Sequence, residues 1–443
     1  MKVTRTRTVW VFTRLLNVLS RKLATFRRMS TLEKRAWLVF HAQRLGRVLR
    51  VTVYAPVYLA PGLILAAMGF RFLPVPNRWR GFGDLIEVPA QYVRAEASGV
   101  IGRHRRVLLA PSGKTSNRAL IHQWRAHFTV IENPVSVFLL LPFTWLPGIG
   151  YGLWNWQAWK TRGVDGKQLR GGLAMLQADA MYDEKHGSLK VLDLPPDLAT
   201  TGRDRLTRLG VKKDDWWVTL HVRERGYHQD DDNQHRNGDV STYYPAMRAI
   251  ADRGGWVIRV GDPSMRPLPP MDHVIDYVHT DAYCDWMDLF LAAHCRFMLG
   301  VSSGPCTLPV LYGKPMVCTN LAPVGPLPTT KNSLVIPKLH WLDREGRFMR
   351  TSEVLQSRLA VAYYQDMFEK TGVVVTDNTS EEITSVTTEM IDILEGSIKY
   401  SEEDERHQSE FRKQWLPNIT PDLWGGRNRV GRAFLRNHGF LRE

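Results

Sequence analysis

The chain has 443 residues, and because an ordinary domain has about 100 to 200, two domains and an extension are expected. The composition, 44% hydrophobic and 23% charged, excludes a disordered, collagen-like or coiled-coil protein. The net charge of +15 is concentrated at one end, where residues 1–50 contain 13 lysines and arginines and one acid, while the remainder is nearly balanced. A basic arm of this kind usually meets an anionic surface, either phospholipid or nucleic acid.

Residues 1–75 are predicted to form a basic amphipathic arm that associates with a membrane. Apolar side chains recur at helical spacing over residues 12–26 and 38–49, with arginines on the other faces. Residues 51–70 carry no charge and are long enough to cross a bilayer, but prolines and glycines interrupt them. The pattern favours in-plane or re-entrant insertion of residues 1–70 at an anionic membrane surface, with core packing as the alternative.

A second uncharged stretch covers residues 133–159 and contains four tryptophans, which suit the head-group layer of a bilayer. Its prolines and glycines argue against a straight spanning helix. Packing in the core or between lobes is the alternative to membrane contact here as well.

From about residue 79 onward, short β-rich runs alternate with helical patterns. Such alternation predicts parallel sheets with right-handed crossovers. Strands are expected at residues 107–110 and 128–131 in the first half and, in the second half, from near Trp216, Trp256, His273, Phe297 and Pro315. Helices are expected at residues 117–128, 243–252, 286–293 and 306–312.

The predicted fold class is therefore α/β, with two Rossmann-like lobes that face a cleft and an N-terminal basic amphipathic helical extension. The first lobe is assigned to residues 76–200 and the second to residues 201–400, because a polar segment follows Pro195 and Pro196. Residues 401–443 are assigned to a C-terminal helical tail. In sheets of this kind, ligands bind beyond the carboxyl ends of the strands.

The segment WWVTLHVRER, residues 216–225, contains a predicted strand that ends at His221, Val222 and Arg223. An arginine at this edge can hold a diphosphate with a planar fork of donors, so Arg223 is the leading phosphate ligand. An ordinary ion pair at the strand end is the alternative. His221 points to the same side of the strand and could act as a base, hold the loop or simply pack. Glu224 is the second candidate base.

Two further strand ends supply candidate donor-binding residues. WVIRVG, residues 256–261, places Arg259 near a strand end and follows it with Gly261, which permits close backbone approach. FMLGVSSGP, residues 297–305, leads into Ser302, Ser303 and Gly304 just before a predicted helix. Hydroxyls and backbone N–H groups at such a start can hold an anion, although the same pattern is also a common helix cap.

Other patterns are weaker. Gly81 and Gly83 in RGFGDL are typical of a tight first-lobe loop that faces the cleft. Lys114 resembles the end of a phosphate-binding P-loop, but Leu108 stands where that motif needs a glycine. The Asp230 cluster is so polar that a solvated loop explains it better than a metal site.

The four cysteines, Cys284, Cys295, Cys306 and Cys318, lack zinc-site spacing and are expected to be small buried residues. No metal or cofactor is therefore expected. The arm lacks a zinc finger, a basic zipper or an aromatic RNA-binding signature, so nucleic acid is not an expected partner.

Several segments resemble a family of bacterial glycosyltransferases associated with surface polysaccharide synthesis. They lie within about residues 80–350 and read LLAPSGKTSNRALIHQWRAHFTVIENP, VTLHVRERGY, HRNGDVSTYYPAMRAIADRGGWVIRVGDPSM, HVIDYVHT, MDLFLAAHCRFMLGVSSGP and GKPMVCTNLAP. The His-Val-Arg element is also similar to that of fucosyltransferases with two Rossmann-like lobes, in which the arginine contacts the donor diphosphate. In that pattern an acid soon follows the arginine, whereas here Glu224 is immediate and Asp230 is late, so a fucose donor is not implied.

The resemblance implies a GT-B-type, metal-independent glycosyltransferase that takes a sugar from a nucleotide-diphosphate donor. Arg223 would contact the donor phosphates beside His221, and the turn 302–304 would seat the phosphates or the ribose. The second lobe would bind the donor and the first a saccharide or lipid-linked saccharide acceptor. With the basic arm, this predicts a peripheral or monotopic protein on the cytoplasmic face of the inner membrane. A non-catalytic membrane-associated scaffold for polysaccharide assembly, with the same fold, is the alternative.

Overall fold

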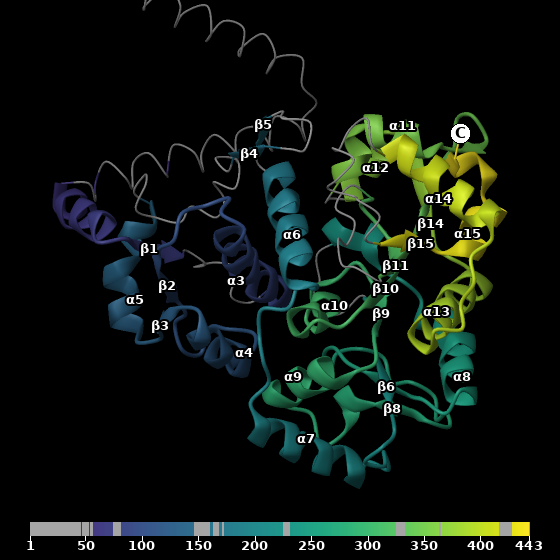
Figure 1. The fold of residues 1–443 in the computed structure, drawn as a ribbon, viewed down its shortest axis with the longest axis horizontal. Helices are drawn as coiled ribbons and strands as arrows, with labels where there is room; N and C mark the ends of the chain where they lie inside the picture. The colour runs from purple at the N-terminus through teal and green to yellow at the C-terminus, as the bar shows by residue number, and fades with distance from the viewer. Residues whose placement is uncertain are drawn as a thin grey trace, which may run out of the picture.

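The computed structural model describes residues 46, 53, 56–73, 81–145, 160–162, 168–170, 172–224, 231–324, 333–362, 365–415 and 428–442. Figure 1 shows two α/β lobes, the first coloured purple to blue and the second teal to yellow. The amphipathic patterns predicted over residues 12–26 and 38–49 lie outside the described residues, apart from Gly46.

The first lobe is built on a three-stranded parallel sheet in the order β1-β2-β3. A helix follows each of the first two strands, as parallel crossovers require. The elements are a helix over residues 56–67, β1 (Phe70–Leu73), α3 (Phe82–Ala97), β2 (Arg105–Leu109), α4 (Arg118–Gln123), η1 (Trp124–Ala126), β3 (Thr129–Ile131), α5 (Pro134–Leu140), η2 (Leu141–Trp145), β4 (Lys160–Arg162), β5 (Gln168–Arg170) and α6 (Gly172–His186).

Each face of this sheet is covered by helices, because successive side chains of a strand point to opposite faces. Leu73 and Leu108 pack in the core that α3, α4 and α6 complete. Phe72 and Val107 enter a smaller core on the other face, which the helix 56–67 and α5 cover. The first face is turned toward the second lobe and the other faces away from it (Figure 1).

Within the described residues, the second lobe holds a seven-stranded sheet in the order β15-β11-β10-β9-β6-β7-β8. All neighbouring strands are parallel. Its strands are β6 (Trp217–His221), β7 (Trp256–Arg259), β8 (Val274–Asp276), β9 (Met298–Val301), β10 (Met316–Leu321), β11 (Leu334–Pro337) and β15 (Arg429–Val430). The central strands are buried on both faces, which explains why they read as continuous apolar runs.

The order of this sheet reverses between β6 and β9. From β6 the chain proceeds outward through β7 and β8, and it then returns to place β9, β10 and β11 on the other side of β6. This is the order of a doubly wound, Rossmann-like sheet, in which the crevice at the reversal binds ligands. His221 pairs in register with Gly300 at this point.

The remaining second-lobe elements cover the sheet or extend it. An antiparallel sheet has the order β13-β12-β14, with β12 (Leu339–Leu342), β13 (Arg347–Phe348) and β14 (Val373–Thr376). The helices are α7 (Pro196–Arg208), α8 (Tyr244–Asp252), α9 (Asp285–His294), α10 (Gly304–Thr307), α11 (Thr351–Gln356), α12 (Gln365–Glu369), α13 (Ser380–Glu395), α14 (Glu402–Trp415) and α15 (Arg432–Asn437), with short 3-10 turns that include η4 (Asp231–Arg236) and η7 (Pro309–Tyr312).

The two lobes share one apolar core. Ala292 of α9 and Leu308 and Leu311 after β9 pack with buried residues of α3 and α4. At the same junction, Asn117 Nδ2 donates a hydrogen bond to the Asp285 carbonyl at 2.9 Å. The crevice at the reversal therefore has the first lobe as its opposite wall.

The structure confirms the predicted α/β class with two lobes of parallel sheet. Each of the five strands predicted in the second half begins within one residue of its expected position. Strands with a continuous apolar run between glycines, prolines and charges have clear ends in a sequence, which explains this agreement.

Two segments outside the predicted lobe boundaries belong to the lobes. β1, which the prediction places in the arm 1–75, is part of the first sheet because Phe72 and Leu73 are buried on its two faces. In the predicted tail 401–443, β15 pairs with β11, and Phe434 is buried in the second-lobe core. The C-terminal segment therefore contributes an edge strand and core residues to the second lobe.

Candidate functional site

A cavity of about 670 Å³ lies where β6 and β9 end, between the two lobes. Seven of the eight predicted site residues line it, namely His221, Arg223, Glu224, Gly261, Ser302, Ser303 and Gly304. The sequence separates these residues by as many as 83 positions, from His221 to Gly304. The reversal of strand order brings them together.

His221 and Ser303 form a hydrogen bond across the reversal. The His221 Nδ1 atom and the Ser303 hydroxyl lie 2.8 Å apart, and both side chains are buried. Burial, together with the guanidinium groups of Arg259 and Arg223, lowers the pKa of His221 to about 3. His221 is therefore neutral at physiological pH and a poor proton acceptor, which favours the loop-holding role over the catalytic one.

Arg223 lines the cavity just beyond β6. Its Nη1 donates to the Asn233 carbonyl at 2.7 Å, and its own carbonyl accepts from Gly238 N at 3.0 Å. The side chain is half-buried, so part of the guanidinium faces the cavity. These two backbone contacts hold Arg223 in place at the edge of the cavity.

A second arginine, Arg236 at the end of η4, binds the loop that follows β9. Its Nε and Nη2 donate to the Ser302 carbonyl at 3.0 and 2.7 Å. Arg236 also lines the cavity, so the Ser302–Gly304 turn has a positive charge beside it. α10 has only four residues, so its dipole at this turn is small.

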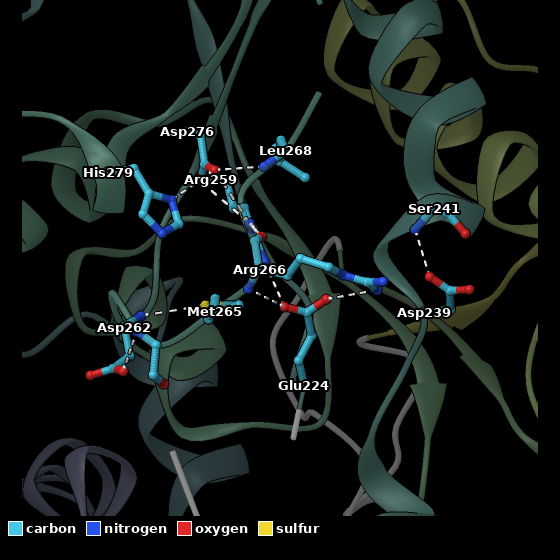
Figure 2. Close-up of polar contacts among 11 residues, drawn as sticks. Glu224, Asp239, Ser241, Arg259, Asp262, Met265, Arg266, Leu268, Asp276 and His279 are labelled. Carbon is cyan, nitrogen blue, oxygen red and sulfur yellow. Dashed lines mark hydrogen bonds and ion pairs between the residues drawn. The ribbon is translucent and has the colours of Figure 1, made fainter. Parts of the chain in front are cut away.

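Glu224 and Arg259 form a buried ion pair next to Arg223 (Figure 2). Arg259 Nη2 donates to Glu224 Oε2 at 2.8 Å, and Arg259 Nη1 donates to the Arg266 carbonyl at 2.6 Å. On its other side, Arg259 lies 3.4 Å from Asp276, which His279 contacts in turn.

Arg259 has no exposed side-chain surface and does not line the cavity. Carboxylates and a carbonyl bind its Nη1 and Nη2, so the structure offers no support for the contact with the donor, which stays a prediction. Glu224 lines the cavity, but its carboxylate is bound to the Arg259 guanidinium. Both residues connect the segment after β6 to the end of β7, and so position Arg223.

Two glycines bring the lobes into backbone contact beside the cavity. A Cβ on Gly304 would lie 2.5 Å from the Gly83 nitrogen, and a Cβ on Gly83 would lie 2.8 Å from the Gly304 Cα. Neither contact involves a flexible side chain that could move aside. The RGFGDL segment lines the cavity, but the predicted loop is wrong from Phe82 onward, because α3 begins there with Gly81 as its N-cap.

The first-lobe wall of the cavity carries carboxylates. Asp84 lies in the first turn of α3, next to the Gly83–Gly304 contact. Deeper in the wall, Arg94 Nε donates to Asp179 Oδ1 at 2.7 Å, and Glu87 lies 3.7 Å from Arg94. Burial raises the pKa of Glu87, and Arg94 opposes that shift.

Asp288 of α9 also lines the cavity. Burial, followed by the charge of Asp285, raises its pKa to about 8. This carboxyl group is therefore largely protonated at neutral pH and can donate a hydrogen bond.

Sequence reasoning missed Asp84, Arg236 and Asp288. Asp84 follows directly on the glycine pair of RGFGDL, and this adjacency was the signal that could have identified it. Arg236 lies in a polar loop far from any strand, and Asp288 lies inside an apolar helix, so neither had a local signal.

Cys295, Cys306 and Cys318 are buried, as predicted, and Cys284 is half-buried. Among the described residues, no three His, Cys, Asp or Glu side chains are grouped so that they could hold a metal ion. None of the helices in the described ranges is both long enough and apolar enough to cross a bilayer.

No protein-family model and no curated protein matches the sequence. Solved structures with partial likeness include a glycosyl transferase family 9 protein from Veillonella parvula DSM 2008, at 12% identity and a TM-score of 0.26, with 52% of this chain aligned to 60% of that one. The chain thus spans less than two thirds of that protein. E. coli ADP-heptose LPS heptosyltransferase II aligns at 12% identity and a TM-score of 0.32, over 57% of this chain and 84% of that one.

E. coli heptosyltransferase WaaC with ADP aligns at 13% identity and a TM-score of 0.33, over 60% of this chain and 90% of that one. The likeness is too distant to identify a ligand or an activity for this chain. The strand order and the cavity of the chain itself therefore carry the functional argument.

Proposed function

We propose that this protein is a glycosyltransferase that moves a sugar from a nucleoside-diphosphate donor to a saccharide acceptor in bacterial surface polysaccharide synthesis. One observation carries the proposal. Arg223, Arg236 and the Ser302–Gly304 turn converge at the strand-order reversal of a Rossmann-like sheet, where the His221–Ser303 hydrogen bond holds the two loops together.

This arrangement suits a diphosphate leaving group. When the bond between the sugar and the diphosphate breaks, negative charge develops on the phosphate oxygens. The Arg223 guanidinium and the hydroxyls and N–H groups of the turn 302–304 are held in place before reaction, so they can stabilise that charge without reorganising. The proposed reaction uses these groups in place of a metal ion and needs no cofactor beyond the donor.

The acceptor hydroxyl also needs a group that takes its proton. Asp84 lies in the first turn of α3, beside the Gly83–Gly304 contact and so near the turn that would hold the phosphates. Because of this position on the first-lobe wall, we propose Asp84 as the base in preference to His221 and Glu224.

The acceptor would enter from the first-lobe side and would be a saccharide or a lipid-linked saccharide. The 13 basic residues among residues 1–50 would hold the protein at an anionic membrane surface, with residues 1–70 as the contact segment. The expected location is the cytoplasmic face of the inner membrane, as a peripheral or monotopic protein.

The test begins with donor binding. The purified full chain is titrated calorimetrically with a panel of ADP-, UDP-, GDP- and CDP-activated sugars, and the donor that binds is then used in labelled form with membranes. Arg223→Ala should weaken donor binding by on the order of 10- to 100-fold, because the variant loses a charge-assisted hydrogen bond to phosphate.

The matched control is Arg248→Ala, which removes an exposed arginine of α8 in the same lobe. It should bind the donor as the unmodified protein does. Equal donor affinities for the unmodified protein and the two variants would show that Arg223 does not bind the donor. Transfer by Arg223→Ala at the unmodified rate would favour a non-catalytic scaffold role for this chain.

A further inference from the structure

An exposed apolar surface lies on the side of the first lobe that faces away from the second lobe (Figure 1). Two elements form it, the helix 56–67 with the turn that follows and α5. Both pack on one small core, in which Val137 and Leu140 of α5 join Tyr58, Leu65 and Ala66 of the helix 56–67. Tyr58 also makes an edge-to-face ring contact at 5.1 Å with Phe143 of η2, which follows α5. We call this surface the outer face, and its exposed residues are Val57, Leu59, Leu63, Ile64, Met68, Val135, Phe138 and Leu139.

The helix 56–67 is apolar on every side. Tyr58, Leu65 and Ala66 pack inward against the sheet, whereas Leu63 and Ile64 are 57% and 62% exposed. A surface helix of a soluble lobe normally places polar residues on its outer side, and a helix that is apolar all round is buried in a larger core or in lipid. We therefore expect the outer face to be covered by lipid or by another protein surface.

α5 repeats this pattern 75 residues later in the chain. Val137 is buried beneath it, while Val135 and Phe138 are 66% and 70% exposed. Exposed apolar residues that occur singly need no explanation, but a cluster from two adjacent elements marks an interaction site.

The charges around the outer face identify the occupant. Residues 56–73 contain one charged side chain, Arg71, and residues 133–145 contain none. Arg71 donates to the carbonyl groups of Ala66 and Phe70 at the end of the helix, and the Arg105 guanidinium lies 5.4 Å from the Phe70 ring. The border of the face is therefore basic, and so is the chain that leads into it, which carries a net charge of +12 over residues 1–50.

We infer that the outer face inserts, parallel to the membrane plane, into the head-group layer of an anionic lipid bilayer. Apolar side chains enter to the depth of the acyl boundary, while the basic border contacts the phosphate groups. This inference rests on the membrane contact proposed above and deepens it, because it adds α5 as a second anchor. It also fixes the orientation of the protein, with the first lobe on the bilayer.

Salt separates the two modes of attachment. The attraction of the basic arm is electrostatic, and at 1 M salt the screening length falls to about 3 Å. Insertion of apolar side chains is not screened. Attachment that persists at high salt therefore reports on the outer face, and attachment that appears only at low salt reports on the arm.

The experiment is flotation of the full chain with vesicles of phosphatidylcholine and phosphatidylglycerol, at 50 mM and 1 M NaCl. The Leu63→Glu, Phe138→Glu double variant places one charge on each element. Its floating fraction at 1 M NaCl should fall at least about tenfold, while flotation at 50 mM NaCl persists through the arm. Val374→Glu is the matched control, because Val374 is also exposed, at 55%, but lies in β14 of the second lobe.

Hydrogen exchange on the unmodified protein tests the inference without a substitution. Vesicles should protect peptides covering residues 56–67 and 134–140 and leave residues 373–376 unchanged. The same samples are also titrated with donor, so that membrane attachment and donor binding are measured separately. If the double variant no longer floats but binds donor normally, the result supports membrane insertion of the outer face and leaves the proposed function unaffected. Equal flotation of the double variant at 1 M NaCl, or protection absent from both peptides, would overturn the inference. If the double variant changed from dimer to monomer without any change in flotation, the inference would also fail. The outer face would then be a contact between two copies of the chain.

Discussion

The two lobes use parallel sheets of different order, and the difference gives them different chemistry. The second-lobe sheet reverses its strand order between β6 and β9, so the loops after these strands diverge and open a crevice. The three-stranded sheet of the first lobe has the simple order β1-β2-β3, and α3 packs its N-terminal end against that crevice. Arg223, Arg236 and the Ser302–Gly304 turn come from the second lobe, and Asp84 and Glu87 from the first. The division is not complete, because Arg94 of the first lobe and Glu224 and Asp288 of the second also line the cavity.

Under the proposed function, anion binding belongs to the second lobe and proton acceptance to the first, so substitutions can separate the two. Substitutions in the second lobe should change donor affinity, and substitutions in the first should change turnover at saturating donor. The predictions below are ordered from the largest expected effect to the smallest.

The largest effect is expected from Asp84→Asn. A missing general base costs roughly 100- to 10,000-fold in rate, while the Kd for donor should stay within about twofold because the amide keeps the same volume. Single-turnover kinetics and calorimetry measure the two quantities separately. A loss of donor affinity with normal turnover would place Asp84 in donor binding and break the division between the lobes.

Gly304→Val tests whether the lobes must touch at their backbones. The new Cβ would lie 2.5 Å from Gly83 N, so the lobes must separate. A displacement of about 1 Å at a reacting centre can cost on the order of 100-fold in kcat/KM. Kinetics and small-angle scattering should show a slower and more open protein, with Gly102→Val as the control, because Gly102 is exposed, lies outside the cavity and has room for a Cβ. Full activity of Gly304→Val would show that the close approach is dispensable.

Glu224→Gln distinguishes a positioning residue from a base. The neutral amide weakens the contact with Arg259 and loosens the segment that carries Arg223. Donor affinity should fall about tenfold, equivalent to about 1.4 kcal/mol, with turnover at saturating donor nearly unchanged. Titration with donor and the pH profile of the maximal rate check this. A rate loss of 100-fold or more at unchanged donor affinity would restore Glu224 as the base.

The smallest effect concerns acid stability. Burial lowers the pKa of His340 and His235 to about 4 each, so both are neutral in the folded second lobe down to that pH. The unfolded chain takes up their protons below about pH 6.5, so stability is lost as pH falls from 6.5 toward 4. Each group contributes up to about 1.4 kcal/mol per pH unit in that window.

His340→Gln should therefore flatten the fall in unfolding free energy between pH 6 and pH 4.5. Urea titrations at several pH values measure the slope, and hydrogen exchange shows which lobe opens. An unchanged slope would mean that His340 does not remain neutral in the folded protein.

The sequence predicted the second-lobe strands well, because buried parallel strands read as apolar runs that end at charges and glycines. It also placed His221, Arg223 and Ser303 at one site, since the carboxyl ends of parallel strands share an edge. The partnership of Arg259 could not be predicted, because Asp276 and Glu224 reach it from separate strand ends. β15 was also missed, because two residues of strand leave no periodic pattern.

The most direct test of the central claim is a structure of the full chain with a bound nucleoside-diphosphate sugar. The account predicts diphosphate oxygens within about 3.2 Å of the Arg223 guanidinium and of the turn 302–304, beside the His221–Ser303 hydrogen bond. A diphosphate bound at another edge of either sheet, away from the Arg223 guanidinium, would contradict it.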